Sequence, residues 1–185
     1  MAATSMPPLT PQPRSPRTLA RVAGVFYLLT FVTGVLALTS SQAAFAANLA
    51  ATACYVGVTV LFYRLFRPVH HGLSLLAAAV SAVGLVLGLL KMFKLVDVPL
   101  NNLVFFGGYC LLIGALIVRA TFLPRVLGVL MMIGGLGWLT FVSPALAKQL
   151  SPWNFAPGMI GEGVLTVWLL VVGVNEPRWR EQAAS

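Results

Sequence analysis

The fold is decided by residues 22–63, VAGVFYLLTFVTGVLALTSSQAAFAANLAATACYVGVTVLFY, a stretch that contains no charged residue. A helix needs about 20 residues to cross the hydrocarbon of a bilayer, so this stretch is too long for one span. The polar segment TSSQ at residues 39–42 divides it. The pattern therefore predicts two membrane-spanning helices, near residues 20–38 and 45–65.

The composition of the whole chain points to the same solvent. Hydrophobic residues make up 59% of the sequence and charged residues only 9%, with a mean hydropathy of +0.92. Soluble domains usually carry about 25% charged residues and 45–50% apolar ones. A chain of this composition cannot cover a water-facing surface with polar groups, so we expect lipid around it.

Four further apolar runs predict helices at about residues 72–93, 101–119, 124–144 and 157–174. The connections are short, which favours up-and-down hairpins. We therefore predict an all-α fold, a polytopic transmembrane helical bundle of six helices over residues 19–175. A disordered, basic, proline-rich tail over residues 1–18 precedes it, and a polar tail over residues 176–185 follows it.

The orientation is predicted from the basic residues, because arginines and lysines segregate in the six-helix arrangement. All nine arginines fall on one side: Arg14, Arg17, Arg21, Arg64, Arg67, Arg119, Arg125, Arg178 and Arg180. The three lysines, Lys91, Lys94 and Lys148, fall on the other side. Since basic residues are retained in the cytoplasm, both termini are expected there, with the protein in the inner (plasma) membrane of the cell.

A cleaved signal peptide is the alternative for residues 1–46. Three arginines precede the first apolar run, and AFA at residues 44–46 resembles a signal-peptidase site. Cleavage would leave five spans in the same orientation, and the sequence leaves this alternative open.

Several short motifs resemble one family of small bacterial membrane proteins, the domain of unknown function 4386. They are ARVAGVFYLL at residues 20–29, the turns RPV at 67–69 and FLPRVLG at 122–128, and GE at 161–162 with WLL at 168–170. The resemblance covers about residues 18–175 and implies an integral membrane protein of about six helices with no established activity. The segments between the first and second helices and between the third and fourth are shorter than the resemblance leads us to expect.

Glu162 is the only acidic residue inside a predicted span. It lies about five residues into its helix, or roughly 8 Å deep at 1.5 Å per residue. A carboxylate there is costly to desolvate, so we expect it to be paired, hydrogen-bonded or protonated. The expected ligand-binding partners are Lys91 and Lys94 as cations and Tyr55 and Tyr109 as hydroxyl donors. Two interpretations remain, a buried polar staple between helices and the anchor of an outward-opening polar pocket.

Four arginines at the predicted inner face, Arg64, Arg67, Arg119 and Arg125, are expected to form a basic collar that contacts anionic lipid headgroups. Membrane lipids are therefore the expected partners, with a membrane protein partner or a second copy of the chain as alternatives. Nucleic acid is not expected, because the basic residues lie in short gaps between apolar runs.

The sequence contains no recognisable catalytic, metal or cofactor motif. His70 and His71 are adjacent and point about 100° apart on a helix, which makes a poor metal clamp. Cys54 and Cys110 form no metal-binding pattern, and Trp138 and Trp168 are expected to be packing residues. We accordingly expect no catalytic residue, no metal and no cofactor.

The function expected from these features is non-enzymatic. The chain would bind a lipid-like or small apolar ligand, or would act as a membrane partner subunit. The first alternative is a small transporter or channel with an outer polar pocket around Glu162. The second is an intramembrane enzyme, which would need another catalytic group facing Glu162.

Overall fold

The structure, a computed structural model, describes residues 15–184, and within this range the chain is helical and has no strand. The helices are α1 (Pro16–Thr39), α2 (Ala44–Phe66), α3 (His71–Met92), α4 (Leu103–Arg119), α5 (Arg125–Leu139), the 3₁₀ helix η1 (Thr140–Val142), α6 (Pro144–Leu150), α7 (Phe155–Val171) and α8 (Glu176–Ala184). Of the disordered tail expected over residues 1–18, residues 1–14 lie outside the described residues, whereas residues 16–18 are not disordered but form the start of α1.

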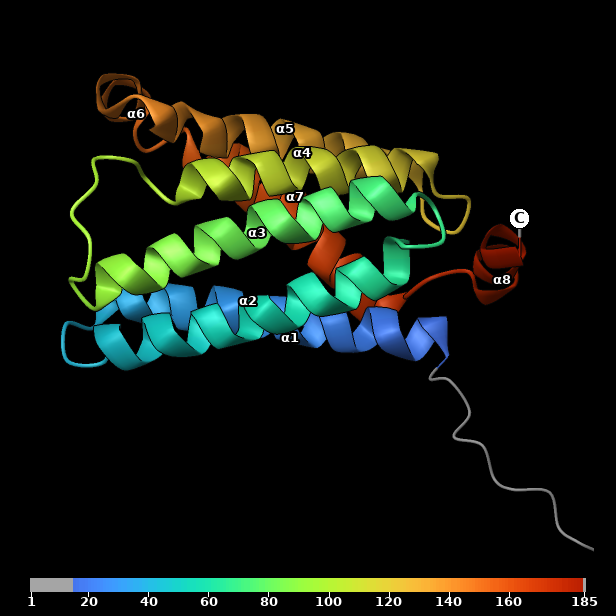
Figure 1. Ribbon diagram of the computed structural model, residues 1–185. Helices are drawn as coiled ribbons and strands as arrows, with labels where there is room; N and C mark the ends of the chain where they lie inside the picture. The colour runs from blue at the N-terminus through green and yellow to red at the C-terminus, as the bar shows by residue number, and fades with distance from the viewer. Residues whose placement is uncertain (1–14, 185) are drawn as a thin grey trace, which may run out of the picture.

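Six of these helices form a closed ring. Going around it, α1 packs against α2, α2 against α3, α3 against α4, α4 against α5, α5 against α7, and α7 against α1. The helices α1 to α5 run roughly along a common direction, α7 crosses obliquely behind them, and consecutive helices of the ring alternate in direction (Figure 1). The ring encloses a core rich in aromatic side chains, among them Tyr27, Tyr55, Phe62, Phe66 and Tyr109.

Side chains cap free backbone donors where α1 and α3 begin. The Ser15 hydroxyl accepts a hydrogen bond from the Thr18 N–H, and Pro16 follows as the first helical residue of α1. At α3, the Nδ1 atom of His70 accepts from the Leu73 N–H at 3.1 Å. The first histidine of the His70–His71 pair is therefore a helix cap.

Helices α4 and α5 approach closely because glycines face each other across the contact. A Cβ atom added at Gly114 would lie 2.6 Å from the Gly128 carbonyl oxygen, and one added at Gly107 would lie 2.9 Å from that of Gly135. Both distances are too short for any side chain. Small residues at such contacts are typical of helix packing in membranes, where close van der Waals contact drives association.

The outer surface of the ring is apolar. Valine and leucine side chains on α1, α3 and α5 are about half exposed, for example Val32, Leu75, Val83, Val126 and Leu136. Four helices are long and apolar enough to cross a membrane, namely α1, α2, α3 and the continuous segment Arg125–Val142. The pair α6 and α7, bent by 79°, makes a fifth if it counts as one span, whereas α4 has only 17 residues. The described residues thus form an all-helical membrane protein with four to five candidate spans.

The arginines and the lysines lie at opposite ends of the bundle, as the positions of the helix ends show (Figure 1). The start of α1, the end of α2, the α4–α5 turn and α8 lie at one end, which we call the arginine end. It carries the eight described arginines. The end of α3 and α6 lie at the other end, which carries the three lysines.

Two helices were not expected from the sequence. The sequence predicts a loop before the last helix, but residues 144–150 form α6. The Ser143 hydroxyl caps this helix by accepting a hydrogen bond from the Leu146 N–H. The polar tail over residues 176–185 contains α8, which docks against the arginine end. The predicted helix at 124–144 also ends earlier, because α5 gives way to the 3₁₀ turn η1 at Thr140.

Candidate functional site

Glu162 lies in the interior of the ring, on α7, and only 6% of its surface is exposed. Both of its carboxyl oxygens accept hydrogen bonds from other helices. The Tyr27 hydroxyl on α1 donates to Oε2 at 2.7 Å, and the Trp138 indole Nε1–H on α5 donates to Oε1 at 2.5 Å. The carboxyl group therefore ties α1 and α5 to α7, which lies between them in the ring.

Glycines in α7 make this geometry accessible. Gly158, one turn before Glu162, lies directly against the Trp138 indole, in space that a side chain would fill. Gly161 likewise lies against the backbone carbonyl of Leu130 on α5. Without a Cβ at these positions, α7 can lie close enough to α5 for the short indole hydrogen bond.

Three further polar side chains surround the pair formed by Tyr27 and Glu162. The Tyr55 ring on α2 packs edge-on against the Tyr27 ring at 5.8 Å and, at a similar distance, against the ring of Tyr109 on α4. Cys110, fully buried, follows Tyr109 on α4. We call these six residues, Tyr27, Tyr55, Tyr109, Cys110, Trp138 and Glu162, the carboxyl cluster.

Two hydroxyl groups of the carboxyl cluster are buried without a hydrogen-bond partner among the described residues, those of Tyr55 and Tyr109. Nearby, Thr59 on α2 and Ser81 on α3 share a 2.7 Å hydrogen bond. All six helices of the ring thus contribute a polar side chain to its interior. These residues lie near the middle of most of the helices, so the polar groups form a layer across the bundle and not a path along it.

The structure brings only some of the predicted ligand residues together with Glu162. Tyr55 and Tyr109 belong to the carboxyl cluster, although neither hydroxyl bonds to Glu162. Lys91 donates from Nζ to the Leu100 carbonyl at 2.7 Å, and Lys94 is exposed at the end of α3. Neither lysine contacts the carboxyl group.

Tyr27 and Trp138, the two residues that bond to Glu162, are not identified as its partners by the sequence. No pattern assigns a role to Tyr27, and Trp138 is expected only as a packing residue. The available signal was that both side chains combine a large apolar body with a hydrogen-bond donor, and that such donors usually find an acceptor when buried.

A pocket with polar lining residues lies at the lysine end, where the transporter alternative expects an outer polar pocket around Glu162. It measures about 270 Å³, and its lining includes Lys91, Asn101 and Asn102. Glu162 is not among its lining residues.

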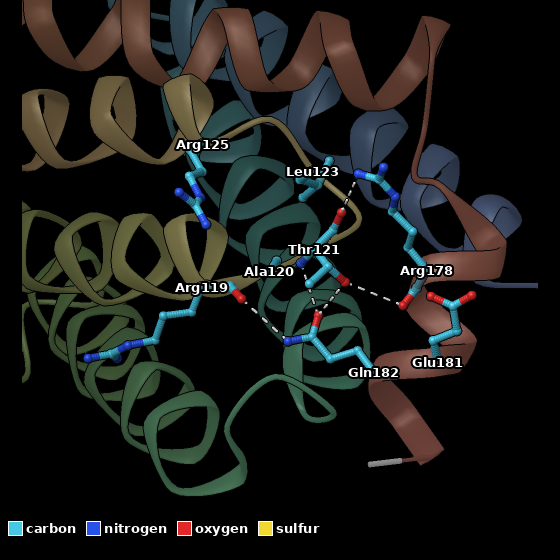
Figure 2. A pocket seen from close by; sticks show the side chains of 8 residues that line it. All are labelled: Arg119, Ala120, Thr121, Leu123, Arg125, Arg178, Glu181 and Gln182. Carbon is cyan, nitrogen blue, oxygen red and sulfur yellow. Dashed lines mark hydrogen bonds between the residues drawn. The ribbon is translucent and has the colours of Figure 1, made fainter.

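A larger groove of about 710 Å³ lies at the arginine end (Figure 2). One wall is the turn between α4 and α5, with Arg119 and Arg125, and the other wall is α8, with Arg178, Glu181 and Gln182. We call it the arginine groove. Among the described residues, the guanidinium groups of Arg119 and Arg125 form no ion pair, since the one ion pair found joins Arg180 to Glu176 at 3.7 Å.

Hydrogen bonds hold the α8 wall in place. Gln182 accepts from the Thr121 N–H at 3.0 Å and donates to the Arg119 carbonyl at 3.4 Å. Arg178 donates to the Thr121 carbonyl at 3.4 Å, and Trp179 donates from Nε1 to the Leu65 carbonyl at 2.8 Å. These hydrogen bonds therefore fix the position of α8 and with it the shape of the arginine groove.

A second groove, of about 700 Å³, adjoins the arginine groove and shares Thr121, Leu123 and Arg178 with it. Its other lining includes the apolar side chains of Phe122, Trp168, Val172 and Val174 and the polar side chains of Arg17, Asn175 and Glu176. We call it the apolar groove. Of the four arginines predicted to contact lipid headgroups, Arg119 and Arg125 line the arginine groove, whereas Arg64 and Arg67 are exposed at the end of α2 and line neither groove.

No group of three or more histidine, cysteine, aspartate or glutamate side chains that could hold a metal ion occurs within residues 15–184. Cys54 and Cys110 are both free. The geometry of the described residues thus offers a hydrogen-bonded carboxyl group inside the ring and a basic groove at one end of it.

Comparison with known proteins adds a family. Residues 99–173 match the family described as Domain of unknown function (DUF4386). No curated protein and no solved structure matches the chain. The matched segment includes α4, α5 and α7, and hence Glu162, Trp138, Tyr109 and the arginine pair of the groove. The resemblance seen in the sequence is confirmed over this segment, where the chain matches the DUF4386 family.

Proposed function

We propose that the protein is a non-enzymatic integral membrane protein of a bacterial inner membrane that binds a phosphate-bearing membrane lipid in the arginine groove. The observation that carries the proposal is that Arg119 and Arg125, which form no ion pair with a described residue, line a groove whose other wall is the docked helix α8. Arginine side chains pair with phosphate oxygens through charge-assisted hydrogen bonds.

The adjoining apolar groove supports a lipid over a soluble phosphate. Trp168 and Phe122 line it, and it meets the arginine groove at Thr121 and Arg178. A lipid with its phosphate between the two arginines could lay apolar chain against Trp168 and Val172. A soluble phosphate would use only the basic half of this surface.

The proposed topology places the arginine end at the cytoplasmic face. We propose that all six helices of the ring span the membrane and that both termini are cytoplasmic. The segregation of eight arginines to one end and three lysines to the other supports this orientation. It places Arg119 and Arg125 at the level of the headgroups of the inner leaflet.

The experiment is mass spectrometry of the lipids that copurify with the protein in mild detergent. The wild type is compared with Arg119→Gln/Arg125→Gln, and Arg180→Gln serves as the control because Arg180 pairs with Glu176 and does not line the arginine groove. We expect the double variant to retain less phospholipid than the control. Equal retention would contradict the proposal.

A small transporter or channel centred on Glu162 is the second candidate. The buried, unpartnered hydroxyls of Tyr55 and Tyr109 favour it, since a polar solute could use them. Against it, both oxygens of Glu162 are already bonded to the protein, and the polar layer runs across the bundle. A flux assay in liposomes separates the two, because uptake that is lost in Glu162→Gln while the fold persists would favour the transporter.

A further inference from the structure

The arginine groove carries a negative charge as well as its arginines. Glu181 on α8 lines the groove, on the wall opposite Arg119 and Arg125 (Figure 2). It is exposed and forms no ion pair with any described residue, whereas Glu176, the other acidic residue of α8, pairs with Arg180. Among the described residues, the groove therefore presents Arg119 and Arg125 without ion-pair partners on one wall, and Arg178 beside the unpaired carboxylate of Glu181 on the other.

Arg178, the nearest candidate partner along α8, does not neutralise this carboxylate. It lies three residues before Glu181, a spacing at which side chains can pair on a helix. Its guanidinium group instead donates across the groove to the Thr121 carbonyl at 3.4 Å. The carboxylate of Glu181 is thus left available to a ligand.

A groove lined by arginines alone would accept any phosphate headgroup. A carboxylate on the facing wall repels a headgroup that is only anionic and attracts one that also carries a cation. A primary ammonium group offers three hydrogen-bond donors to a carboxylate, whereas a trimethylammonium group offers none. The pattern of charges consequently matches a phosphate that bears a primary ammonium group.

We propose that the arginine groove selects phospholipids with a phosphoethanolamine headgroup, with Arg119 and Arg125 binding the phosphate and Glu181 binding the ammonium group. This inference rests on the proposed function and names the headgroup class of that site. Glu181 is the specificity-determining residue, and the arginines supply the affinity that all phospholipids share.

The test is native mass spectrometry of the delipidated full-length protein with an equimolar mixture of ethanolamine, choline and glycerol phospholipids of identical acyl chains. The variants are Glu181→Gln and, as a matched control, Asp97→Asn, which removes an exposed carboxylate at the lysine end. We expect the wild type and Asp97→Asn to retain the ethanolamine lipid about threefold over the choline lipid, the effect of one exposed ion pair. Glu181→Gln is expected to abolish this preference and to raise retention of the glycerol lipid.

Equal retention of the ethanolamine and choline lipids by the wild type, or a preference that survives in Glu181→Gln, would overturn the headgroup assignment. Failure of the proposed function has a different signature, since Arg119→Gln/Arg125→Gln would then leave retention of all three lipids unchanged. An added arm contains soluble phosphoethanolamine without lipid. Binding of that compound together with no retention of the ethanolamine lipid would overturn the lipid as the source of the headgroup.

Discussion

The hydroxyl of Tyr27 donates a 2.7 Å hydrogen bond to Oε2 of Glu162, across 135 positions in the sequence. The bond joins the first helix of the ring to the last, so it closes the ring. The other carboxyl oxygen accepts from Trp138, so Glu162 serves as an acceptor on both sides. The contacts of α7 with α1 and α5 therefore include two hydrogen bonds to one side chain, so a substitution at Glu162 tests both of them.

Glu162→Gln is expected to destabilise the protein. A glutamine side chain has one acceptor oxygen and one NH₂ donor, so either Tyr27 or Trp138 would lose its acceptor. A buried donor left unsatisfied costs about 1–3 kcal/mol. Thermal unfolding in detergent is the measurement, with Asp97→Asn as the control because Asp97 is exposed and lines neither groove. A Glu162→Gln melting temperature equal to that of the control would refute the role of Glu162 as a double acceptor.

Tyr27→Phe tests the same link from the donor side. The variant keeps the ring contacts with Tyr55 and Phe62 but removes the hydroxyl, so we expect a loss of about 1–3 kcal/mol. The control is Tyr63→Phe, whose hydroxyl bonds to His71 at the surface. If chemical denaturation gives both variants the same stability, the buried hydrogen bond contributes no more than the exposed one.

Gly158→Ala is expected to displace the Trp138 indole, because the added methyl group would occupy the space of its ring. The cost should exceed that of a simple helix substitution, and the tryptophan fluorescence should change. Gly163, five residues later on α7, is the matched control, since no atom lies within 4 Å of a Cβ added there. Gly163→Ala should be neutral or stabilising by up to about 1 kcal/mol, as expected for glycine to alanine in a helix. Identical behaviour of the two variants would show that the contact between Gly158 and Trp138 does not constrain packing.

Both termini are predicted to be cytoplasmic. Fusions of a reporter that is active only in the periplasm and of one that fluoresces only in the cytoplasm, each placed at the C-terminus, measure the side directly. We expect fluorescence and no periplasmic activity. Periplasmic activity at the C-terminus would contradict the predicted orientation and would place α8 outside the cell.

The position of Glu162 could be read from the sequence, but its partners could not. A single acidic residue in a long apolar run marks a buried carboxyl group, whatever surrounds it. Tyr27 and Trp138 lie 135 and 24 positions away, and only the rotation of each helix about its axis decides that they face Glu162. A soluble helix reveals its inner face by its polar outer face, whereas these helices are apolar all round, so no periodic pattern marks the face.

The sequence predicts one wall of the arginine groove but not the other. The α4–α5 turn predicted a basic surface through Arg119 and Arg125. The other wall, α8, is not predicted because residues 176–185 are polar and show no helical period of apolar residues. Pro177 lies in the first turn of α8, where proline is tolerated, and docking of Gln182 and Trp179 to distant carbonyls stabilises the helix. Such tertiary hydrogen bonds leave no local signal in the sequence.

The most direct test of the lipid-binding account is the thermal shift that added phospholipid produces in the delipidated protein. A ligand that binds only the folded state stabilises it in proportion to the logarithm of its concentration over Kd, by about 2.7 kcal/mol at one hundred times Kd. Arg119→Gln/Arg125→Gln is compared with Arg64→Gln/Arg67→Gln, which removes the same number of charges at the same end but outside both grooves. We predict that the melting temperature of the wild type and of Arg64→Gln/Arg67→Gln rises with phospholipid, and that the rise is largely lost in Arg119→Gln/Arg125→Gln. An equal rise in both double variants would contradict binding in the arginine groove.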